Sequence, residues 1–527
     1  MLERAIYDEG EFMKTKRTVA DKLNTLLFGK DLRVTTGDPF TEVQKGDYSS
    51  YYPLEKYIDF SQAVPESCYD VRDFGADEKA AEETNTSAIQ KAIDECSEKG
   101  GGTVLVSGGR YTVTTIYLRS DVTLFISKDS ALCSNTTGKG YSNNALIYAE
   151  NCENIAITGS GRIFGNGVYF GRKPAGENQF SPAEVIDVIA MRQVSRAQIR
   201  FAHPSKYGSL LVLNRCRNVS ISNIIFEDSA WWTCKLLCCD KVKIHDAVIW
   251  NNRHVANADG FDVTGSSNVH INHCFVSTAD DGIVLKNAIW CGCDGPMHDI
   301  TVENCEVISR ANAFKIGTET TYDIYNVTVQ NCRFFMTDLY PGTVSGVSIE
   351  ACDGARVHDI TVRNIEMDRC TCPVFIRLCN RNRAAEVTSS TANKTEIIKD
   401  DAKDKPVPKK MFDRKSELYN VLVENIKATD VELPVLVAGY RQRMKTKYCT
   451  DITLRNFDIT YRDAVEIYDK RLFIPEYAKV YPECWRFRNL PAYGIWARHC
   501  RNLKIENFNC KGIKNSWRKE KIFIDCI

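Results

Sequence analysis

The sequence lacks an excess of charge of either sign. Its 527 residues contain 68 Lys and Arg and 68 Asp and Glu, so the formal net charge is zero. A protein that binds nucleic acid usually carries a basic excess on at least one face. We therefore expect no nucleic-acid partner.

Long apolar runs are also missing. No stretch approaches the roughly 18 consecutive apolar residues of a membrane-spanning helix, so we expect no membrane segment. The first residues, MLERAIYDEGEFMKTKRTVADKLNTLLFGK, mix acids and bases and contain no apolar core followed by small residues. They are unlike a secretory signal. We expect a cytoplasmic protein, or a secreted one if a signal has already been removed.

Cysteine, in contrast, is plentiful, with 22 residues. In a small exported protein this number would indicate disulfides, but this chain is long and shows no export signal. The segments CGC at Cys291–Cys293 and CTC at Cys370–Cys372 space their thiols too closely for a usual zinc site. We expect reduced cysteines that act as small core residues, no metal and no cofactor.

A short motif recurs along the chain. Each copy begins with Asn or Asp, alternates aliphatic and polar residues and usually ends in Asn, as in NVSISN, NVHINH, DITVEN, NVTVQN, DITVRN, NVLVEN, DITLRN and NLKIEN. When the weaker copy KVKIHD from Lys241 is included, the starts of the copies from Asn218 step by 23, 27, 31, 27 and 33 residues. The alternation indicates strands, and a period of this size indicates stacked coils that bury a common core. We predict an all-β fold, a single-stranded right-handed parallel β-helix.

Two kinds of side chain repeat in phase with the motif. Cys274, Cys305 and Cys332 each fall six residues after the start of their own copy. The same offset on successive coils gives the same direction, so we predict a stacked ladder of thiols. The recurrent Asn residues at the starts and ends of the copies predict ladders of side-chain amides in the turns.

Three segments depart from the repeat. Residues 1–67 form an N-terminal extension with a predicted helix near Glu11–Leu27, ahead of a β-helix domain at 68–527. The stretch Asn85–Lys99 has apolar residues at helical spacing and stops at three glycines, which predicts a helix that caps the solenoid. Residues 380–417 are polar and charge-rich and predict a long inserted loop.

Two acidic segments are not explained by strand formation. They are Asn257–Asp262 (NADGFD) and Thr278–Gly282 (TADDG), and Asp259 and Asp280 are 21 residues apart, about one coil. Stacked coils would bring their carboxylates together. Hydrolysis of a glycoside needs one protonated and one ionised carboxyl group, and crowding separates their pKa values. Acids in solvated turns or a calcium site are alternatives.

These residues resemble a known family, glycoside hydrolase family 28, the polygalacturonase family of pectin-degrading enzymes. The resemblance spans roughly residues 68–527. It rests on the two aspartate motifs and on YDVRDFGA at Tyr69–Ala76, GGGTVLVSGGRY at Gly100–Tyr111, ITGSGRIFGNG at Ile157–Gly167 and LPAYGIWARHCRNLKIEN at Leu490–Asn507.

The resemblance implies roles for the aspartates. Asp280 would be the general acid, and Asp259 and Asp281 would position and deprotonate the attacking water. Asn257 would orient the neighbouring carboxylates. The reaction would invert the anomeric carbon and use no metal. Trp231 and Trp232 lie one coil before the aspartate motifs. Trp232 would stack on a sugar, although a core role is an alternative.

Two family motifs are altered. Ala311 aligns where the family has a histidine, and Ser348-Ile349-Glu350 stands where an Arg-Ile-Lys grips the galacturonate carboxylate. Cations recognise a sugar carboxylate by charge-assisted hydrogen bonds, and Glu350 would repel it. Polygalacturonate is therefore a doubtful substrate, and a neutral sugar is an alternative. Lys315 could supply a substitute charge, as could Arg310 or Arg377.

His254 could replace the missing imidazole of the family, or it could be a histidine in a turn without a functional role. We interpret His499 near the C-terminus as structural. We predict an inverting glycoside hydrolase on a plant cell-wall, pectin-type oligosaccharide, exo-acting and not a standard polygalacturonase. A non-catalytic carbohydrate-binding β-helix is the first alternative. A uronate lyase or epimerase ranks last, because we expect no Arg or Lys cluster beside the aspartates. The oligomeric state is open.

Overall fold

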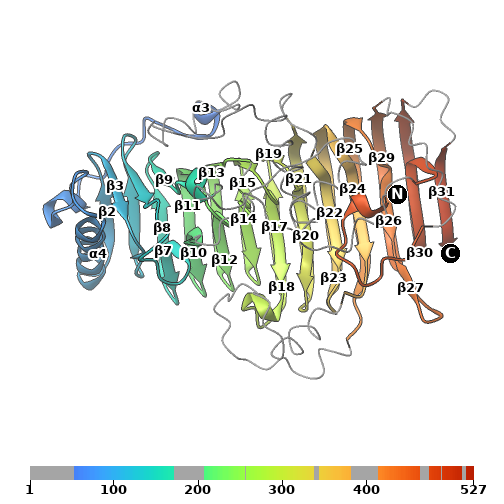
Figure 1. The fold of residues 1–527 in the computed structure, drawn as a ribbon, viewed down its shortest axis with the longest axis horizontal. Helices are drawn as coiled ribbons and strands as arrows, with labels where there is room; N and C mark the ends of the chain where they lie inside the picture. Colours follow the sequence, from blue (N-terminus) through green and yellow to red (C-terminus); the bar gives the residue numbers. More distant parts are fainter. Residues whose placement is uncertain are drawn as a thin grey trace, which may run out of the picture.

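The computed structural model describes residues 53–170, 207–253, 255, 257–336, 343–381, 414–462, 474–487, 490–512 and 518–527. Within these ranges, 29 strands join through parallel pairings and two further strands form a small antiparallel hairpin. The strands lie side by side along one axis, from the blue N-terminal end to the red C-terminal end (Figure 1). The predicted parallel β-helix is confirmed.

The helical elements are α3 (Leu54–Tyr57), η1 (Val71–Phe74), α4 (Glu82–Glu98), α5 (Gly167–Phe170), η3 (Ile289–Cys291) and η5 (Cys484–Phe487). The strands of the first half are β1 (Tyr69–Asp70), β2 (Gly102–Val106), β3 (Arg110–Val113), β4 (Ile116–Tyr117), β5 (Val122–Ile126), β6 (Ala131–Ser134), β7 (Ala145–Glu150), β8 (Glu153–Thr158), β9 (Arg162–Phe164), β10 (Ser209–Asn214), β11 (Arg217–Glu227), β12 (Cys234–Leu237), β13 (Asp240–Trp250), β14 (Phe261–Thr264) and β15 (Ser267–Asn272). The remaining strands are β16 (Phe275–Thr278), β17 (Ile283–Asn287), β18 (Met297–Glu303), β19 (Glu306–Ser309), β20 (Asn312–Thr320), β21 (Ile324–Phe335), β22 (Thr343–Ala351), β23 (Arg356–Asp368), β24 (Cys370–Leu378), β25 (Glu417–Val431), β26 (Val435–Ala438), β27 (Tyr440–Gln442), β28 (Lys445–Lys447), β29 (Cys449–Tyr461), β30 (Ala492–Lys511) and β31 (Lys519–Cys526).

The strand pairings form three faces along the axis. The first face carries the repeated motif, through β8, β11, β13, β15, β18, β21, β23, β25, β29 and β30. The second continues through β9, β16 and β19 and the later halves of the long strands. The third runs through β7, β10, β12, β14, β17, β20, β22, β24, β26, β30 and β31.

The motif residues have distinct structural tasks. In β15, Val269 and Ile271 point into the core while the alternate residues remain half-buried, as the period of two predicts. The starting residue, such as Asn218 or Asn268, has a positive φ. Asn and Asp adopt this left-handed conformation more readily than other residues with a side chain, which explains their recurrence at the bends.

The predicted amide ladders are confirmed. Along one turn, the side-chain amide of Asn425 donates to Asn364 Oδ1 over 2.8 Å and accepts from Asn456 over 2.9 Å. A second ladder joins motif starts, for example Asn218 to Asn154 over 2.6 Å. Each amide both donates and accepts, so a stack of identical residues satisfies its own hydrogen bonds.

The predicted cysteine register is confirmed as well. Cys274, Cys305 and Cys332 immediately precede residues that pair in register on neighbouring coils, and all three are buried in the main core. All 22 cysteines of the chain are free thiols.

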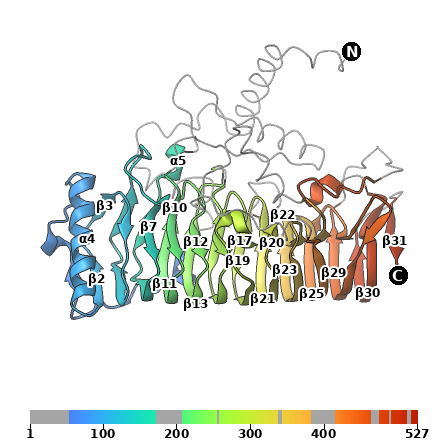
Figure 2. The same ribbon diagram turned by 90° about the horizontal axis from the view of Figure 1, so that it is seen from below.

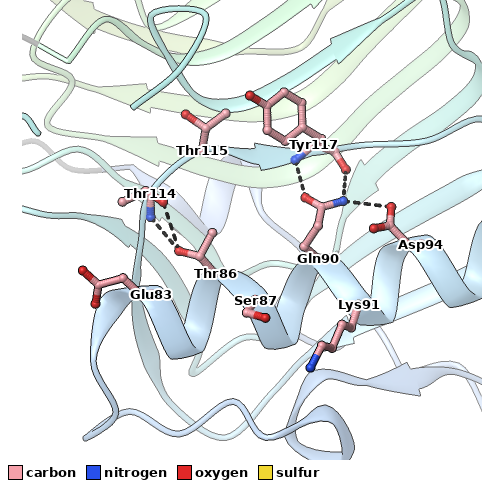
Figure 3. Close-up of a pocket in the computed structure, with 9 residues that line it drawn as sticks. All are labelled: Glu83, Thr86, Ser87, Gln90, Lys91, Asp94, Thr114, Thr115 and Tyr117. Atoms are coloured by element: carbon pink, nitrogen blue, oxygen red, sulfur yellow. Dashed lines mark hydrogen bonds between the residues drawn. The ribbon is translucent and has the colours of Figure 1, made fainter. Parts of the chain in front are cut away.

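The predicted capping helix is α4. It buries Ala88, Ile89, Ala92 and Ile93 against the first coils and lies across the blue end of the solenoid (Figure 2). A hollow of about 410 Å³ lies between α4 and the start of β4 (Figure 3). Gln90 fills part of it by pairing with both backbone groups of Tyr117, over 2.8 and 2.9 Å. The helix thereby protects a strand edge that would otherwise be open.

The remaining predicted segments are described only in part. The helix predicted near Glu11–Leu27 and most of the predicted insertion at 380–417 lie outside the described residues. The end of the N-terminal extension packs on the outer surface: Tyr57 in α3 lies against Phe275, with ring centroids 5.8 Å apart. Among the described helices, none is both long enough and apolar enough to cross a membrane.

Candidate active site

Three aspartates meet at the bend between the second and third faces. Asp259 lies two residues before β14, and Asp281 lies two residues before β17. The backbone N–H of Gly260 donates to the carbonyl of Asp281 over 2.9 Å, which sets the register. Asp259 therefore stacks on Asp281, and not on Asp280 as the spacing of 21 residues predicts.

The structure brings the carboxylates of Asp259, Asp280 and Asp281 together. One oxygen atom from each lies within 4.8 Å of the others. Asp259 and Asp281 are 3% and 5% exposed, whereas Asp280 is half-buried. The backbone N–H of Asp281 donates to Asp280 Oδ1 over 3.0 Å. The most accessible carboxyl group of the three is thus that of Asp280, at the open side of the cluster.

Two buried lysines accompany the aspartates, so the expectation of no Lys beside them is wrong. Lys286 Nζ lies 3.2 Å from Asp259 Oδ2, and Lys315 Nζ lies 3.3 Å from Asp281 Oδ2. Both lysines stand at outward positions of third-face strands, because the residues next to them, Leu285, Phe314 and Ile316, point into the main core. A lysine within such a strand, IVLKN or NAFKI, is the sequence signal that identifies them.

Burial and charge act in opposite directions on these groups. Burial and the other carboxylates raise the pKa of Asp259 well above its usual value, while Lys286 opposes that rise. Burial alone would lower the pKa of Lys286, but Asp262 and Asp259 raise it well above its ordinary range. The cluster therefore places a charged lysine beside the carboxyl group of Asp259, whose pKa is raised, which is a suitable setting for acid–base chemistry.

A further side chain at the cluster is Asn312, which was not predicted from the sequence. Its side-chain amide donates to Asp281 Oδ1 over 2.8 Å, and its backbone N–H donates to the same oxygen over 3.2 Å. The residue in register beside Asp281 is Asn312 and not Ala311, which the alignment placed at the family's histidine position. An uncharged amide fixes this carboxylate here.

The substrate-binding residues predicted one coil further on are enclosed. Glu350 is fully buried and accepts a hydrogen bond from Ser348 over 2.7 Å. Lys315 Nζ also lies 3.4 Å from both Glu483 Oε1 and the Tyr481 hydroxyl. Lys315 is 1% exposed, so its charge is already neutralised by protein groups.

The other predicted residues flank the cluster or lie outside the described part. The ammonium of Lys286 lies 3.6 Å from the ring centroid of Trp232, and the rings of Trp231 and Trp232 stack with centroids 6.3 Å apart. Asn257 occupies the turn before Asp259 with a φ of 57°. His254 lies outside the described residues. His499, predicted as structural, is 3% exposed and bonds to Asp525 over 2.7 Å.

The three carboxylates also have a spacing that a metal ion would fit. Lys286 and Lys315 already bring two positive charges to the carboxyl groups of Asp259 and Asp281. An added divalent cation would meet their repulsion, which disfavours the calcium alternative.

A segment between β29 and β30 reaches back to this cluster. We call residues 474–487 the covering segment; its orange-red coil lies at the upper right of Figure 2. Arg498 in β30 donates to the carbonyl of Ile474 over 2.7 Å, and Arg377 in β24 donates to that of Glu476 over 2.6 Å. At its far end, Tyr481 and Glu483 contact Lys315 in β20. The covering segment therefore crosses from the C-terminal coils to the side of Asp281.

Comparison with known proteins agrees with this architecture. The family described as Glycosyl hydrolases family 28 matches residues 96–469. An endo-polygalacturonase from Pectobacterium carotovorum subsp. carotovorum is 26% identical over 318 residues, which cover 56% of this chain and 73% of that protein.

Solved structures of the same family share the fold. An exopolygalacturonase from Thermotoga maritima superposes with a TM-score of 0.58 at 19% identity, covering 89% of this chain and 96% of that one. A family 28 exopolygalacturonase from Yersinia enterocolitica gives 0.58 at 17% identity, covering 88% and 79%. With a right-handed parallel β-helix and a family match over most of its length, this chain is a glycosidase that belongs to glycosyl hydrolase family 28.

Proposed function

We propose that this glycosidase is an inverting, exo-acting hydrolase of pectin-type or related oligosaccharides and is not a standard polygalacturonase. Asp280 donates a proton to the leaving oxygen, because it is the least buried of the three carboxyl groups. Asp259 and Asp281 hold and deprotonate the attacking water. The observation that carries the proposal is the clustering of these three groups within 4.8 Å.

The covering segment supports exo action. Its contacts with Lys315 cover the third face of the β-helix at β20, next to Asp281, and we call this covered side the closed end. An apolar cluster that includes Cys484, Phe487, Phe375 and Trp496 fixes the segment to the coils beneath it. A long polymer cannot continue through a closed end, so the enzyme would release short products from a chain end.

The composition of the closed end supports a neutral sugar there. The carboxyl groups of Glu350, Glu483 and Asp281 surround the single ammonium of Lys315. Burial raises the pKa of Glu350 well above its usual value, in spite of Lys315. Ser348 and Glu350 carry no positive charge that could bind a galacturonate carboxylate. The guanidinium of Arg377, on the coil after Glu350, donates to the backbone carbonyls of Ala438, Gly439 and Glu476. Rhamnose, galactose or xylose would fit such a site better than galacturonate.

The two lysines do not favour a lyase or an epimerase. Such an enzyme needs an uncharged base to remove the C5 proton. Burial alone would lower the pKa of Lys315, but Asp281, Tyr481 and Glu483 raise it well above its usual value. Lys286 is held charged in the same way. Both lysines are therefore cations that pair with buried carboxylates and do not act as bases.

Inversion rests on family membership and needs its own measurement. Acid and base in inverting enzymes are commonly about 6.5–9.5 Å apart, and about 5–5.5 Å in retaining enzymes. The three oxygen atoms here lie within 4.8 Å of each other, which is nearer to the second range. The anomer that is formed first, observed by NMR, decides between the two outcomes.

The experiment compares wild type with Asp280→Asn on oligogalacturonates and on pectic oligosaccharides that carry neutral sugars. Asp458→Asn, at an exposed position of β29, is the matched control. We expect single-sugar or short products from wild type and the control, faster release from substrates with neutral sugars, and almost none from Asp280→Asn. Saturable binding without release by wild type would favour the binding-module alternative, and products with a 4,5-double bond would favour the lyase.

We also propose that the protein works in a reducing compartment such as the cytoplasm. All 22 cysteines are free thiols, although Cys449, Cys500 and Cys526 stand in register on adjacent strands. An oxidising compartment tends to link neighbouring thiols. Thiol titration of denatured protein isolated from its natural source should return 22 thiols, and a value lower by several pairs would contradict this proposal.

A further inference from the structure

Lys286 is a buried charge on the outer side of β17, opposite to Ile283 and Leu285, which point into the main core. It is 5% exposed, and its neighbours Ile283, Val284 and Leu285 are apolar and buried. Its ammonium lies 2.6 Å from Asp262 Oδ1 and 3.2 Å from Asp259 Oδ2. The indole of Trp232 covers the ammonium at 3.6 Å from the ring centroid. The cation is thus held by three side chains from the two preceding coils.

Fold stability does not explain this arrangement. Taking charges out of water costs several kcal/mol for each ion, and apolar residues of similar volume are often as stable or more stable. The preceding coil has an uncharged residue at the same strand position: Thr264 pairs with Lys286 and is buried. The fold can therefore fill this position without a charge, and a lysine at this point calls for another reason.

The hydrogen bonding of Asp259 supplies that reason. Its Oδ2 is bound by Lys286, whereas its Oδ1 is buried without a hydrogen-bond partner among the described residues. A buried carboxylate oxygen without a partner is costly unless a ligand or water uses it. Asp280 and Asp281 present oxygen atoms within 4.8 Å of the same carboxylate. Oδ1 is therefore the oxygen of Asp259 that remains available to accept a proton.

We propose that Lys286 is a positioning residue for hydrolysis: anchored by Asp262 and covered by Trp232, it holds Asp259 by Oδ2, so that Oδ1 faces the attacking water. This inference rests on the proposed function and deepens it. It gives Asp262, the last residue of the NADGFD segment, the role of an anchor. It also gives Trp232 a role beside the sugar-stacking one, because one face of the indole covers a cation.

The charges around Asp259 give the proposal a measurable consequence. Asp262, Asp280 and Asp281 face it with negative charge, and Lys286 faces it with positive charge. Lys235, the other cation near this group, acts on Asp262. Removing Lys286 takes away the charge that favours the ionised form of Asp259, so its pKa rises further. A base must be ionised, so the acidic limb of the rate profile moves to higher pH.

The first test compares the variants Lys286→Met, Lys286→Arg and Lys286→Met/Asp262→Asn. The double variant leaves one carboxylate without a cation and keeps the test usable if Lys286→Met does not fold. We expect kcat to fall at least tenfold in the double variant, with KM within threefold of wild type. The acidic limb of kcat/KM should move up by about one pH unit or more, and Lys286→Arg should recover part of both effects. The proposal would be overturned if the acidic limb of kcat/KM did not move in a folded double variant. It would also be overturned if Lys286→Met and Lys286→Arg lost kcat equally.

The second test does not depend on activity, so it separates this proposal from the proposed function. Asp259→Asn is made in wild type and in the Lys286→Met/Asp262→Asn background, and urea midpoints are measured at pH 7. In wild type the change removes a partner of Lys286 and should lower the midpoint. Without the lysine it removes an unpaired buried charge and should raise the midpoint. The same sign in both backgrounds contradicts the role of Lys286, even if the protein hydrolyses every substrate offered; opposite signs with no hydrolysis would leave the pairing in place and refute the function alone.

Discussion

The asparagine ladders and the aspartate cluster both arise from the stacking of coils, but only the ladders satisfy their own hydrogen bonds. In both, neighbouring coils place similar polar side chains above one another. Asn364, Asn425 and Asn456 donate and accept in turn, so the stack satisfies itself. Asp259 and Asp281 can only accept when ionised, and their charges repel. The fold must add Lys286, Lys315 and the amide of Asn312 to hold them. A self-satisfying stack marks a structural turn, and a stack that needs outside cations marks a site of chemistry.

The largest effect on activity is expected when a carboxyl group of the aspartate cluster is replaced by an amide, as in the asparagine ladders. Asp280→Asn replaces a carboxyl group with an amide, and we expect kcat to fall by about 10²–10⁴-fold, because the general acid is lost. The urea midpoint should stay the same or rise, since one of three crowded negative charges is removed. Product release and urea unfolding, measured side by side, check both parts. Retention of more than a tenth of the activity would remove Asp280 from its proposed role.

Removing a cation should instead damage the fold around the cluster. Lys315→Met leaves Asp281 and Glu483 buried beside each other without their shared partner. We expect the free energy of unfolding to fall by about 3–5 kcal/mol, which is typical when one partner of a buried ion pair is removed. Lys315→Met/Glu483→Gln should recover part of the loss. A single variant as stable as wild type would mean that Lys315 is not needed to compensate these acids.

The cluster should also respond to pH in a way that the ladders cannot. Burial raises the pKa of Asp262 to about 6, even with Lys286 beside it, whereas an unfolded Asp titrates near its ordinary value. The folded state therefore binds a proton that the unfolded state has lost, and stability falls as pH rises from about 4 to 6, by about 1.4 kcal/mol for each pKa unit of difference. Asp262→Asn should flatten this part of the profile. Urea unfolding at several pH values measures it, and parallel profiles for the two proteins would exclude Asp262 as the source.

The smallest effect is expected in the ladder itself. Asn425→Ala removes one donor and one acceptor at an exposed turn and replaces a residue with a φ of 56°. We expect a loss of about 1 kcal/mol in the free energy of unfolding and unchanged kcat. Asn425→Asp keeps the acceptor for Asn456 but cannot donate to Asn364, so it isolates the donor. A fall in kcat for either variant would contradict the division between turn and active site.

The fold could be predicted from the sequence because each coil repeats one local rule. The Asn and Asp residues that start the motifs take positive φ, the alternate aliphatic residues enter the core, and α4 carries the pattern of a cap. These features depend on neighbours within a few residues or on the repeat itself. The family resemblance depends on the same short motifs and was confirmed by the comparison.

The site was less accessible because it depends on register between coils. A shift of one residue decides that Asp259 lies on Asp281 and that Asn312, not Ala311, touches that carboxylate. The sequence did not reveal which carboxylates the two lysines pair with, because the partners lie 24 to 34 residues away: Lys286 is 24 residues after Asp262 and Lys315 is 34 after Asp281. The covering segment reaches Lys315 from 166 and 168 residues further along the chain, and no periodic pattern announces that contact.

The dependence of each coil on its two neighbours has a consequence for how the enzyme would lose function. In a linear stack, where each coil contacts only its neighbours, we expect unfolding to begin at an end and to proceed from coil to coil. Arg498 ties the covering segment to β30, near the C-terminal end, while the aspartates stand on coils in the interior of the stack. Mild heating or denaturant should therefore release the covering segment before the acid–base groups separate. The enzyme would first become less selective for chain ends and only later stop breaking bonds.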